Sequence, residues 1–164
     1  MPIPNSHIAD IFNRIADLLE IKEDNPFRIR AYRDAARTVG DLSGNVADMV
    51  EKGEDLAKLP GIGKDLAAKI REMVATGSLS FLQKLEEEVP GGLIDLLRIS
   101  GLGPRKVGRL YRELGITSLI ELKTALKDKK VRQLNGFGEK TEQNISEKIE
   151  RLSAGQQRQP GSGR

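Results

Sequence analysis

Three short turns of the same pattern constrain the fold of this chain more than any other feature. They occupy residues 59–63 (Leu-Pro-Gly-Ile-Gly), 99–103 (Ile-Ser-Gly-Leu-Gly) and 134–138 (Leu-Asn-Gly-Phe-Gly), and we call them the first, second and third hairpins. The glycines allow a positive φ and a close approach of another backbone. Because each turn opens a helix, it leaves backbone N–H groups unpaired at the positive helix end, which suits a phosphate. Three such turns in 164 residues predict a nucleic-acid backbone as the ligand.

The composition narrows the class of protein. Charged residues make up 31% of the chain and aromatic residues 4%, which is typical of a helical protein with a charged surface. The absence of Cys excludes disulfides and thiol catalysis, and a single histidine argues against a histidine metal cluster or a Ser-His-Asp triad. No apolar run reaches membrane-spanning length, and the N-terminus lacks the apolar core of a signal peptide. We expect a cytoplasmic, nucleoid-associated protein that does not bind membranes.

The net charge of +3 does not by itself indicate a nucleic-acid partner. The last fourteen residues hold three Arg and no acidic residue, so residues 1–150 carry 24 basic and 24 acidic side chains (27 − 3 against 24). A binding surface for DNA must therefore come from local clustering of cations.

Apolar residues recur at a spacing of three or four along most of the chain, which predicts an all-α fold. We expect helices over residues 6–20, from 26 past 37, and over 46–51, 64–75, 80–88, 104–114, 118–127 and 139–152. Asn5 or Ser6 can cap the first helix, and Asn25 the second. The Pro-Gly-Gly at residues 90–92 predicts one domain over 1–89 and another over 90–152, followed by a disordered tail over 153–164.

The residues around the three hairpins differ in charge. Lys64 follows the first turn, and Arg105 and Lys106 follow the second; these cations favour phosphate binding. In the third hairpin, Glu139 and Glu142 bring negative charge to the N–H groups that a phosphate would need, so we expect this copy to be structural. The pattern resembles the helix-hairpin-helix, a module that binds DNA backbone phosphates without reading bases. The alternative is an interaction scaffold in which the turns only connect packed helices.

Two further stretches extend the resemblance: residues 25–36 (Asn-Pro-Phe-Arg-Ile-Arg-Ala-Tyr-Arg-Asp-Ala-Ala) and 75–77 (Ala-Thr-Gly). With the first hairpin, they resemble the N-terminal region of bacterial and archaeal family X DNA polymerases, over roughly residues 1–150. The resemblance implies a polymerase beta-like lyase-type domain that holds a 5′-phosphate downstream of a gap. A fingers-like helix-hairpin-helix subdomain that holds the upstream strand would follow it.

The resemblance also implies a role in DNA repair with gapped, nicked or 5′-phosphorylated DNA as the partner. This sequence does not contain the family's polymerase palm or its histidine-rich phosphoesterase domain. We therefore expect no polymerase activity from this chain alone. Two alternatives follow: a fragment of a longer enzyme, whose native gene encodes a palm downstream, or a stand-alone relative. We expect a monomer that needs no cofactor to bind DNA.

The resemblance assigns candidate binding residues to three clusters. They are Gly61, Ile62, Gly63 and Lys64 at the first hairpin; Arg28, Tyr32 and Arg33 on the second helix; and Gly101, Leu102, Gly103, Arg105 and Lys106 at the second hairpin. Hairpins of this family can also hold Na⁺ or K⁺ between turn carbonyls and a DNA phosphate. The carbonyls at the matching positions belong to Leu59, Ile62, Ile99 and Leu102.

Lys69 is the candidate catalytic residue. Some members of the family remove a 5′-deoxyribose phosphate through a lysine Schiff base, and Lys69 stands at the matching position. The amine must lose its proton to attack the sugar aldehyde, so nearby cations or desolvation must favour the neutral form. Asp65 and Phe81 replace basic residues expected in such a pocket, and Asp65 would also repel phosphate. A plain phosphate contact or a solvated helix position is the alternative for Lys69.

Two aromatic residues on the second helix also have alternative interpretations. Tyr32 lines the pocket in the resemblance, yet an aromatic residue on an amphipathic helix usually packs in the core. Phe27 is either a core residue as well or a platform on which an unpaired template base stacks.

Overall fold

Every regular element of the protein is a helix in the part that the structure describes. The computed structural model describes residues 2–158, with side chains through Leu152, and no strand occurs in that range. The all-α prediction is therefore confirmed. The chain divides between Val89 and Pro90 into two compact units, which we call the N-terminal and C-terminal units.

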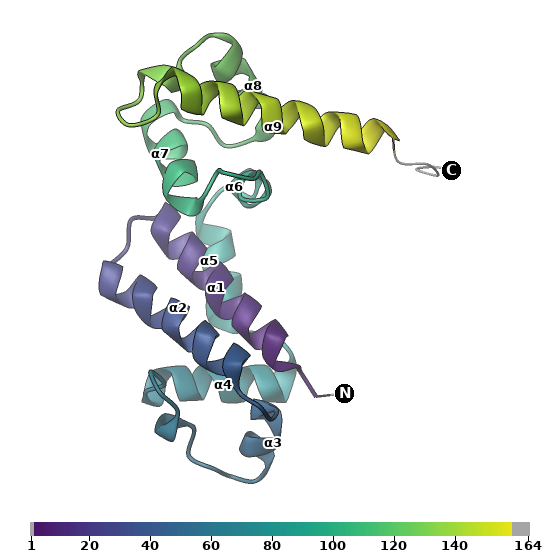
Figure 1. Cartoon of the computed structure of the whole chain (residues 1–164). Coiled ribbons are helices and arrows are strands. Elements are labelled where there is room, and N and C mark those ends of the chain that lie inside the picture. Colours follow the sequence, from purple (N-terminus) through teal and green to yellow (C-terminus); the bar gives the residue numbers. More distant parts are fainter. Residues whose placement is uncertain (1, 159–164) are drawn as a thin grey trace. The chain divides into compact units, whose positions relative to one another are not determined.

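The N-terminal unit is built around a pair of long helices. In Figure 1, α1 (Asn5–Ile21) and α2 (Pro26–Asp41) lie side by side, and α5 (Ser80–Glu88) runs along α1. The remaining elements are α3 (Val46–Glu51), the 3₁₀ helix η1 (Leu56–Lys58) and α4 (Lys64–Thr76), and α4 packs against both α3 and η1. The first hairpin is the turn between η1 and α4.

The core of this unit follows from the apolar stripe of α1. Ile8, Phe12 and Ile15 recur at helical spacing and are fully buried. Each such side chain contributes about 1.5–3 kcal/mol of burial free energy. On α2, Ala35 is fully buried, and the Tyr32 ring centroid lies 5.8 Å from that of Phe12.

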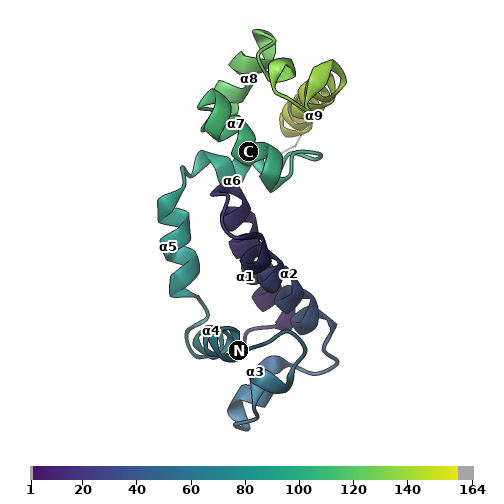
Figure 2. The same ribbon diagram turned by 90° about the vertical axis from the view of Figure 1, so that its left-hand side faces the viewer.

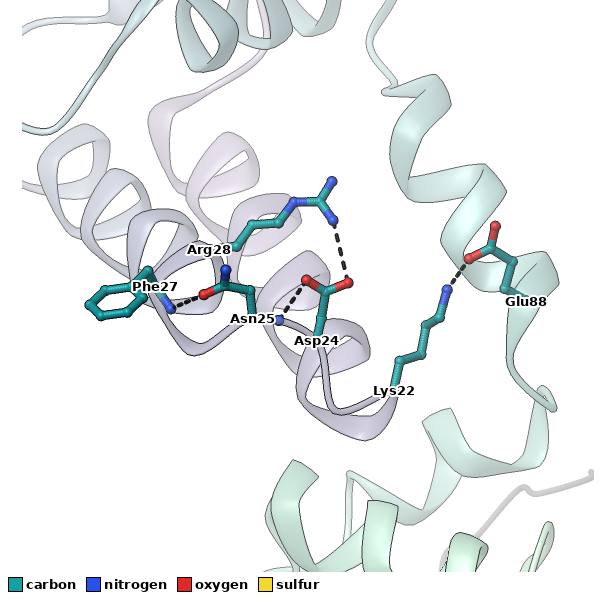
Figure 3. A network of polar contacts seen from close by, with 6 residues as sticks. All are labelled: Lys22, Asp24, Asn25, Phe27, Arg28 and Glu88. Carbon is teal, nitrogen blue, oxygen red and sulfur yellow. Dashed lines mark hydrogen bonds and ion pairs between the residues drawn. The ribbon is translucent and has the colours of Figure 1, made fainter.

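Ion pairs connect these helices at their polar edges. Arg14 of α1 contacts Glu86 of α5 at 3.4 Å. Lys22, at the end of α1, pairs with Glu88 at the end of α5, as Figure 3 shows. These pairs are partly exposed, so solvent screens their charges and they contribute little to stability.

The C-terminal unit holds the other two hairpins. It consists of α6 (Gly92–Leu96), α7 (Pro104–Leu114), α8 (Leu119–Lys127), the 3₁₀ helix η2 (Val131–Gln133) and α9 (Gly138–Arg158). Figure 2 shows these elements from a second direction. The α6 helix contacts α7 and α8, while α9 contacts α8 and η2. The second hairpin therefore joins α6 to α7, and the third joins η2 to α9.

Gly92 allows the close approach of two segments in this unit. A Cβ placed on Gly92 would lie 2.1 Å from the backbone oxygen of Thr117, far inside contact distance. Any side chain here would push the start of α6 away from the segment before α8. The glycine is thus required by packing at the first residue of α6.

Two helix termini and three short elements differ from the sequence expectations. Pro4 holds the N-cap position of α1 without a capping side chain; Asn5 instead accepts from Val46 N–H (2.9 Å) and donates to the Gly44 carbonyl (2.8 Å). The segments that form α6, η1 and η2 have three to five residues each, which is too short for apolar periodicity to indicate a helix. The last helix continues past Leu152 to Arg158, because an established helix extends at low cost. Residues 159–164 of the expected tail lie outside the described residues.

Within residues 2–158, no helix is both long enough and apolar enough to cross a membrane.

Candidate nucleic-acid interface

The three hairpins share one backbone turn. Their first glycines, Gly61, Gly101 and Gly136, have φ of +77°, +84° and +87°, a left-handed conformation that glycine adopts without strain. The apolar residue that follows is buried in each case, with exposures of 3% for Ile62, 2% for Leu102 and 4% for Phe137. Its N–H donates to the carbonyl three residues earlier, at 3.1, 3.0 and 3.0 Å respectively. A buried apolar side chain thus anchors each turn while the first glycine stays exposed.

The second glycine separates the third hairpin from the other two. Gly63 (φ −90°, ψ −172°) and Gly103 (φ −77°, ψ 173°) are extended N-caps. Their carbonyls accept the N–H of Ala67 and Val107 at 2.9 and 3.0 Å. Gly138 instead has φ +68° and is already the first residue of α9. The first two hairpins therefore open their helices with the same backbone geometry, and the third does not.

The N-terminal turns of α4 and α7 present backbone donors. In the described residues, the N–H groups of Gly63, Lys64 and Asp65 meet no acceptor at the start of α4. At the start of α7 the same holds for Gly103 and Lys106. Orphan N–H groups at the positive end of a helix dipole form the arrangement that binds phosphate in many proteins.

Lys69 lies in a cluster that joins α4, α2 and α5. Its Nζ donates to both carboxylate oxygens of Asp65, at 2.9 and 3.0 Å, and lies 5.0 Å from the centroid of the Phe81 ring. Arg28 lies over the same ring at 5.1 Å, and Tyr32 stacks on it at 6.1 Å. The ring attracts both cations and holds them near one another. The structure thus brings together Arg28, Tyr32 and Lys69, as the resemblance implied, with Phe81 between them.

The exposures within this cluster differ. The Lys69 side chain is 17% exposed, whereas that of Asp65 is 79% exposed. Tyr32 is buried, as the core interpretation requires, and burial raises the pKa of its hydroxyl while the Lys69 ammonium opposes that rise. Tyr32 therefore stays protonated at neutral pH. The exposed Asp65 carboxylate is a competitor for any phosphate that approaches Lys69.

Arg33 is placed differently from the other candidate cations. Its Nη2 donates to Asp17 at 2.7 Å and to Glu20 at 2.8 Å, and its Nη1 donates to the Asn13 carbonyl at 3.2 Å. These contacts bind α2 to α1, so the structure does not bring Arg33 into the cluster around Phe81. Lys64, by contrast, is exposed at the start of α4 and has no carboxylate partner in residues 2–158.

The start of α2 holds Phe27 outside the core. Asn25 caps the helix by accepting the N–H of Phe27 at 2.8 Å, and Asp24 accepts the N–H of Asn25 and pairs with Arg28 at 3.4 Å. Phe27 is 82% exposed, and Figure 3 shows its ring pointing away from Asp24 and Lys22. The core interpretation of Phe27 is therefore wrong. An aromatic ring fixed on a capped helix terminus is free to contact a ligand.

Two lysines contact the second hairpin. The first turn of α7 contains no acidic residue. Lys106 Nζ lies 3.4 Å from the Gly101 carbonyl oxygen, and Lys148 of α9 donates to Ser100 Oγ at 3.2 Å. Sequence reasoning missed Lys148, because it lies 48 residues from Ser100. Electrostatically, this turn is better suited to an anion than the first hairpin, where Asp65 places a carboxylate in the first turn of α4.

The third hairpin is occupied by contacts within the protein. Arg109 of α7 donates to the Asn135 carbonyl, lies 5.2 Å from the centroid of the Phe137 ring, and is paired with Glu113 at 2.6 Å. Glu142 is 3% exposed and accepts from the Arg132 backbone N–H (2.9 Å) and Nε (2.8 Å). Glu142 therefore fastens η2 to α9 rather than facing the turn.

Two of the four backbone carbonyls expected to hold a monovalent cation already accept a hydrogen bond within their turn. Leu59 O and Ile99 O each accept the N–H of the central turn residue. A carbonyl oxygen has a second lone pair, so the donor set remains compatible with Na⁺ or K⁺. The monovalent-cation site stays a prediction. Within residues 2–158 no cluster of three or more His, Asp or Glu side chains could hold a metal ion.

The repeated turns and the helices around them define a tandem helix-hairpin-helix protein. Residues 3–79 match the helix-hairpin-helix domain family, and residues 93–151 match the SAM-like helix-hairpin-helix tandem. Together these matches cover the two hairpins of similar geometry and the divergent third one.

Two curated proteins are similar to this chain over most of its length. The DNA polymerase/3′-5′ exonuclease PolX of Bacillus subtilis is 39% identical over 138 residues, which cover 84% of this chain and 24% of that relative. DNA polymerase lambda of Arabidopsis thaliana is 32% identical over 124 residues, covering 74% of this chain and 22% of that relative. The chain thus spans about a quarter of the length of these relatives. Over this stretch it is similar to the N-terminal part of family X DNA polymerases.

Proposed function

We propose that this protein binds DNA without sequence preference, at gaps and nicks, through backbone phosphates. The observation that carries the proposal is the repeated geometry of the first two hairpins. Each combines a left-handed glycine, an extended glycine N-cap and orphan N–H groups with at least one cation in the first helical turn, Lys64 in α4 and Arg105 and Lys106 in α7. Contacts of this kind fix a protein on a nucleic-acid backbone but carry no base information. The names of the two relatives, both DNA polymerases, support DNA as the ligand.

The preference for gaps rests on the N-terminal unit. A gap offers a terminal 5′-phosphate and an unpaired template base, neither of which an intact duplex provides. Arg28 and Lys69 converge on the Phe81 ring, and Lys64 stands at the start of α4. These three cations would bind the terminal phosphate once it displaces Asp24 from Arg28 and Asp65 from Lys69. Phe27 adds an exposed ring on the neighbouring helix terminus. We propose that this unit acts in DNA repair as the gap-recognising part of a family X-type polymerase.

Phe27→Ala should weaken binding to gapped DNA without affecting binding to intact duplex. Stacking of a base on an aromatic side chain contributes about 1–3 kcal/mol, so the affinity for the gapped substrate should fall fivefold or more. The measurement is a titration of both DNAs, labelled with a fluorophore, with the wild type and the variant. Phe27→Trp is the matched control and should retain the preference. An equal loss on both DNAs, or no loss on either, would contradict the stacking role.

A second candidate function, a 5′-deoxyribose phosphate lyase, is favoured by the partial burial of Lys69 next to Tyr32 and Phe81. Its amine would condense with the C1′ aldehyde and release water. β-Elimination would then break the bond to the DNA phosphate, and hydrolysis would free the lysine. The contact with Asp65 opposes this chemistry, because both carboxylate oxygens hold the Lys69 ammonium.

Borohydride reduction on an incised abasic substrate tests the lyase function. If Lys69 forms the Schiff base, reduction traps a covalent adduct that Lys69→Ala abolishes. Asp65→Asn should increase its yield several-fold, because the substitution removes the competing carboxylate charge. Lys64→Ala is the control, since it should lower DNA affinity while preserving trapping at saturating DNA. An adduct that survives Lys69→Ala, or none with wild type and Asp65→Asn, rules out this mechanism.

A further inference from the structure

The helix of the third hairpin places a cation on the turn of the second. Lys148 lies on α9, and its Nζ donates to Ser100 Oγ at 3.2 Å. A Cβ placed on Gly101 would lie 3.4 Å from the same Nζ. The ammonium therefore lies over the glycine whose missing side chain leaves the second turn open to another backbone.

Lys148 differs in its electrostatic surroundings from Arg109, the α7 residue that contacts the third hairpin. Arg109 has its charge balanced by Glu113, at 2.6 Å. No carboxylate within the described residues forms an ion pair with Lys148 Nζ, and its partner is a neutral hydroxyl. On the same turn, Lys106 Nζ approaches the Gly101 carbonyl oxygen at 3.4 Å. Two ammonium groups from different helices thus flank one glycine turn.

We propose that Lys148 is a phosphate-binding residue of the second hairpin. The inference rests on the proposed function, because it takes a DNA phosphate as the ligand of this turn. The Lys148 side chain is half-buried, so its stem is guided along the protein while its ammonium reaches the surface. A hydroxyl holds an ammonium less strongly than an anionic phosphate oxygen does. The ammonium therefore transfers from Ser100 to the phosphate with little movement.

With this role for Lys148, the third hairpin and α9 serve to position the lysine. The third turn does not bind DNA itself; its contacts with Arg109 and the Arg132–Glu142 pair fix the start of α9. This positions Lys148 against the second turn. The C-terminal unit then has one phosphate site, built from a glycine turn of one repeat and a lysine of the other.

The test compares three Lys→Gln variants of the full chain in titrations of gapped DNA between about 50 and 200 mM salt. Each phosphate contact contributes about 0.9 to the slope of log K against log[salt]. Lys148→Gln should therefore reduce the slope by about 0.9, so that its deficit relative to wild type shrinks about 3.5-fold over that range. Lys106→Gln should behave similarly. Lys127→Gln removes the same charge from an exposed position on α8 and should leave the slope unchanged.

The outcomes separate this inference from the proposed function. If Lys106→Gln reduces the slope and Lys148→Gln matches Lys127→Gln, Lys148 is only a structural contact and the inference is overturned. If Lys106→Gln also leaves the slope unchanged, phosphate binding at the second turn fails, and the inference fails with it. Lys148→Arg should restore the slope, and Ser100→Ala should not reduce it. A slope lowered equally by Ser100→Ala would overturn the phosphate role, because Ser100 only holds the lysine in the free protein.

Discussion

Reversing one charge at the start of α4 and one at the start of α7, with Lys64→Glu and Lys106→Glu together, should lower the affinity for gapped DNA about a hundredfold or more at low salt. Two phosphate contacts are lost and two repulsive ones are created, next to the N–H groups that we assign to phosphates. The fold should survive, because an acidic residue in the first turn of a helix is favourable for the helix dipole by about 0.3–1 kcal/mol. The variant therefore separates binding from stability, and circular dichroism with a DNA titration measures both.

The matched control reverses one exposed lysine in each unit away from the hairpins, Lys84→Glu on α5 and Lys123→Glu on α8. Both double variants change the net charge by the same amount, so any effect of overall charge is shared. We expect the control to lose less than a tenth of what the hairpin variant loses. Equal losses would favour the scaffold alternative, in which the turns only connect helices and DNA responds to net charge alone.

Glu142→Ala should destabilise the C-terminal unit by about 2–4 kcal/mol. The carboxylate is buried and accepts two hydrogen bonds, from the Arg132 backbone N–H and from its Nε. Removal leaves the backbone donor without a partner and deprives the guanidinium of its buried acceptor. Amide hydrogen exchange resolved by peptide is the suitable measurement, because a chain of two units need not unfold in one step.

Two further variants should destabilise the C-terminal unit less than Glu142→Ala does. Glu142→Gln keeps an acceptor for the Arg132 N–H and should cost about half as much. Glu139→Ala removes a carboxylate whose side chain is 65% exposed and lies 3.9 Å from Arg132, so the change should stay within about 0.5 kcal/mol. Faster exchange in η2 and α9 is expected only for the Glu142 variants. Unchanged exchange in Glu142→Ala would show that the pair does not stabilise the third hairpin.

The helix pattern was predictable because local signals define it. The bounds of α3, α5 and α7 agree with the expected ranges, and each helix ends near a proline or glycine that cannot continue it. The turns of the three hairpins were equally predictable, because the left-handed φ of their first glycine strongly favours that residue. The different start of α9 was predicted only in part. The charge of Glu142 indicated that the third hairpin differs from the other two, but no sequence feature indicated the positive φ of Gly138.

Contacts between distant helices were not predictable. Arg33 has the residue type and position of a phosphate ligand, yet Asp17 and Glu20 of α1 engage it. Lys148 has no distinguishing neighbours in the sequence, yet it reaches Ser100. Periodicity reports which face of a helix is buried but not which other helix it meets. The candidate site was therefore predictable at its turns and unpredictable at the side chains that surround them.

The measurement that tests the central claim most directly is the affinity of the wild-type protein for gapped, 5′-phosphorylated DNA as a function of salt, with intact duplex as the comparison. Binding through backbone phosphates predicts a linear fall of log K with log[salt], with a slope that grows by about 0.9 for each phosphate engaged. It also predicts tighter binding to the gapped DNA at every salt concentration. An affinity that does not change between low and moderate salt would contradict the claim that the hairpins bind DNA phosphates.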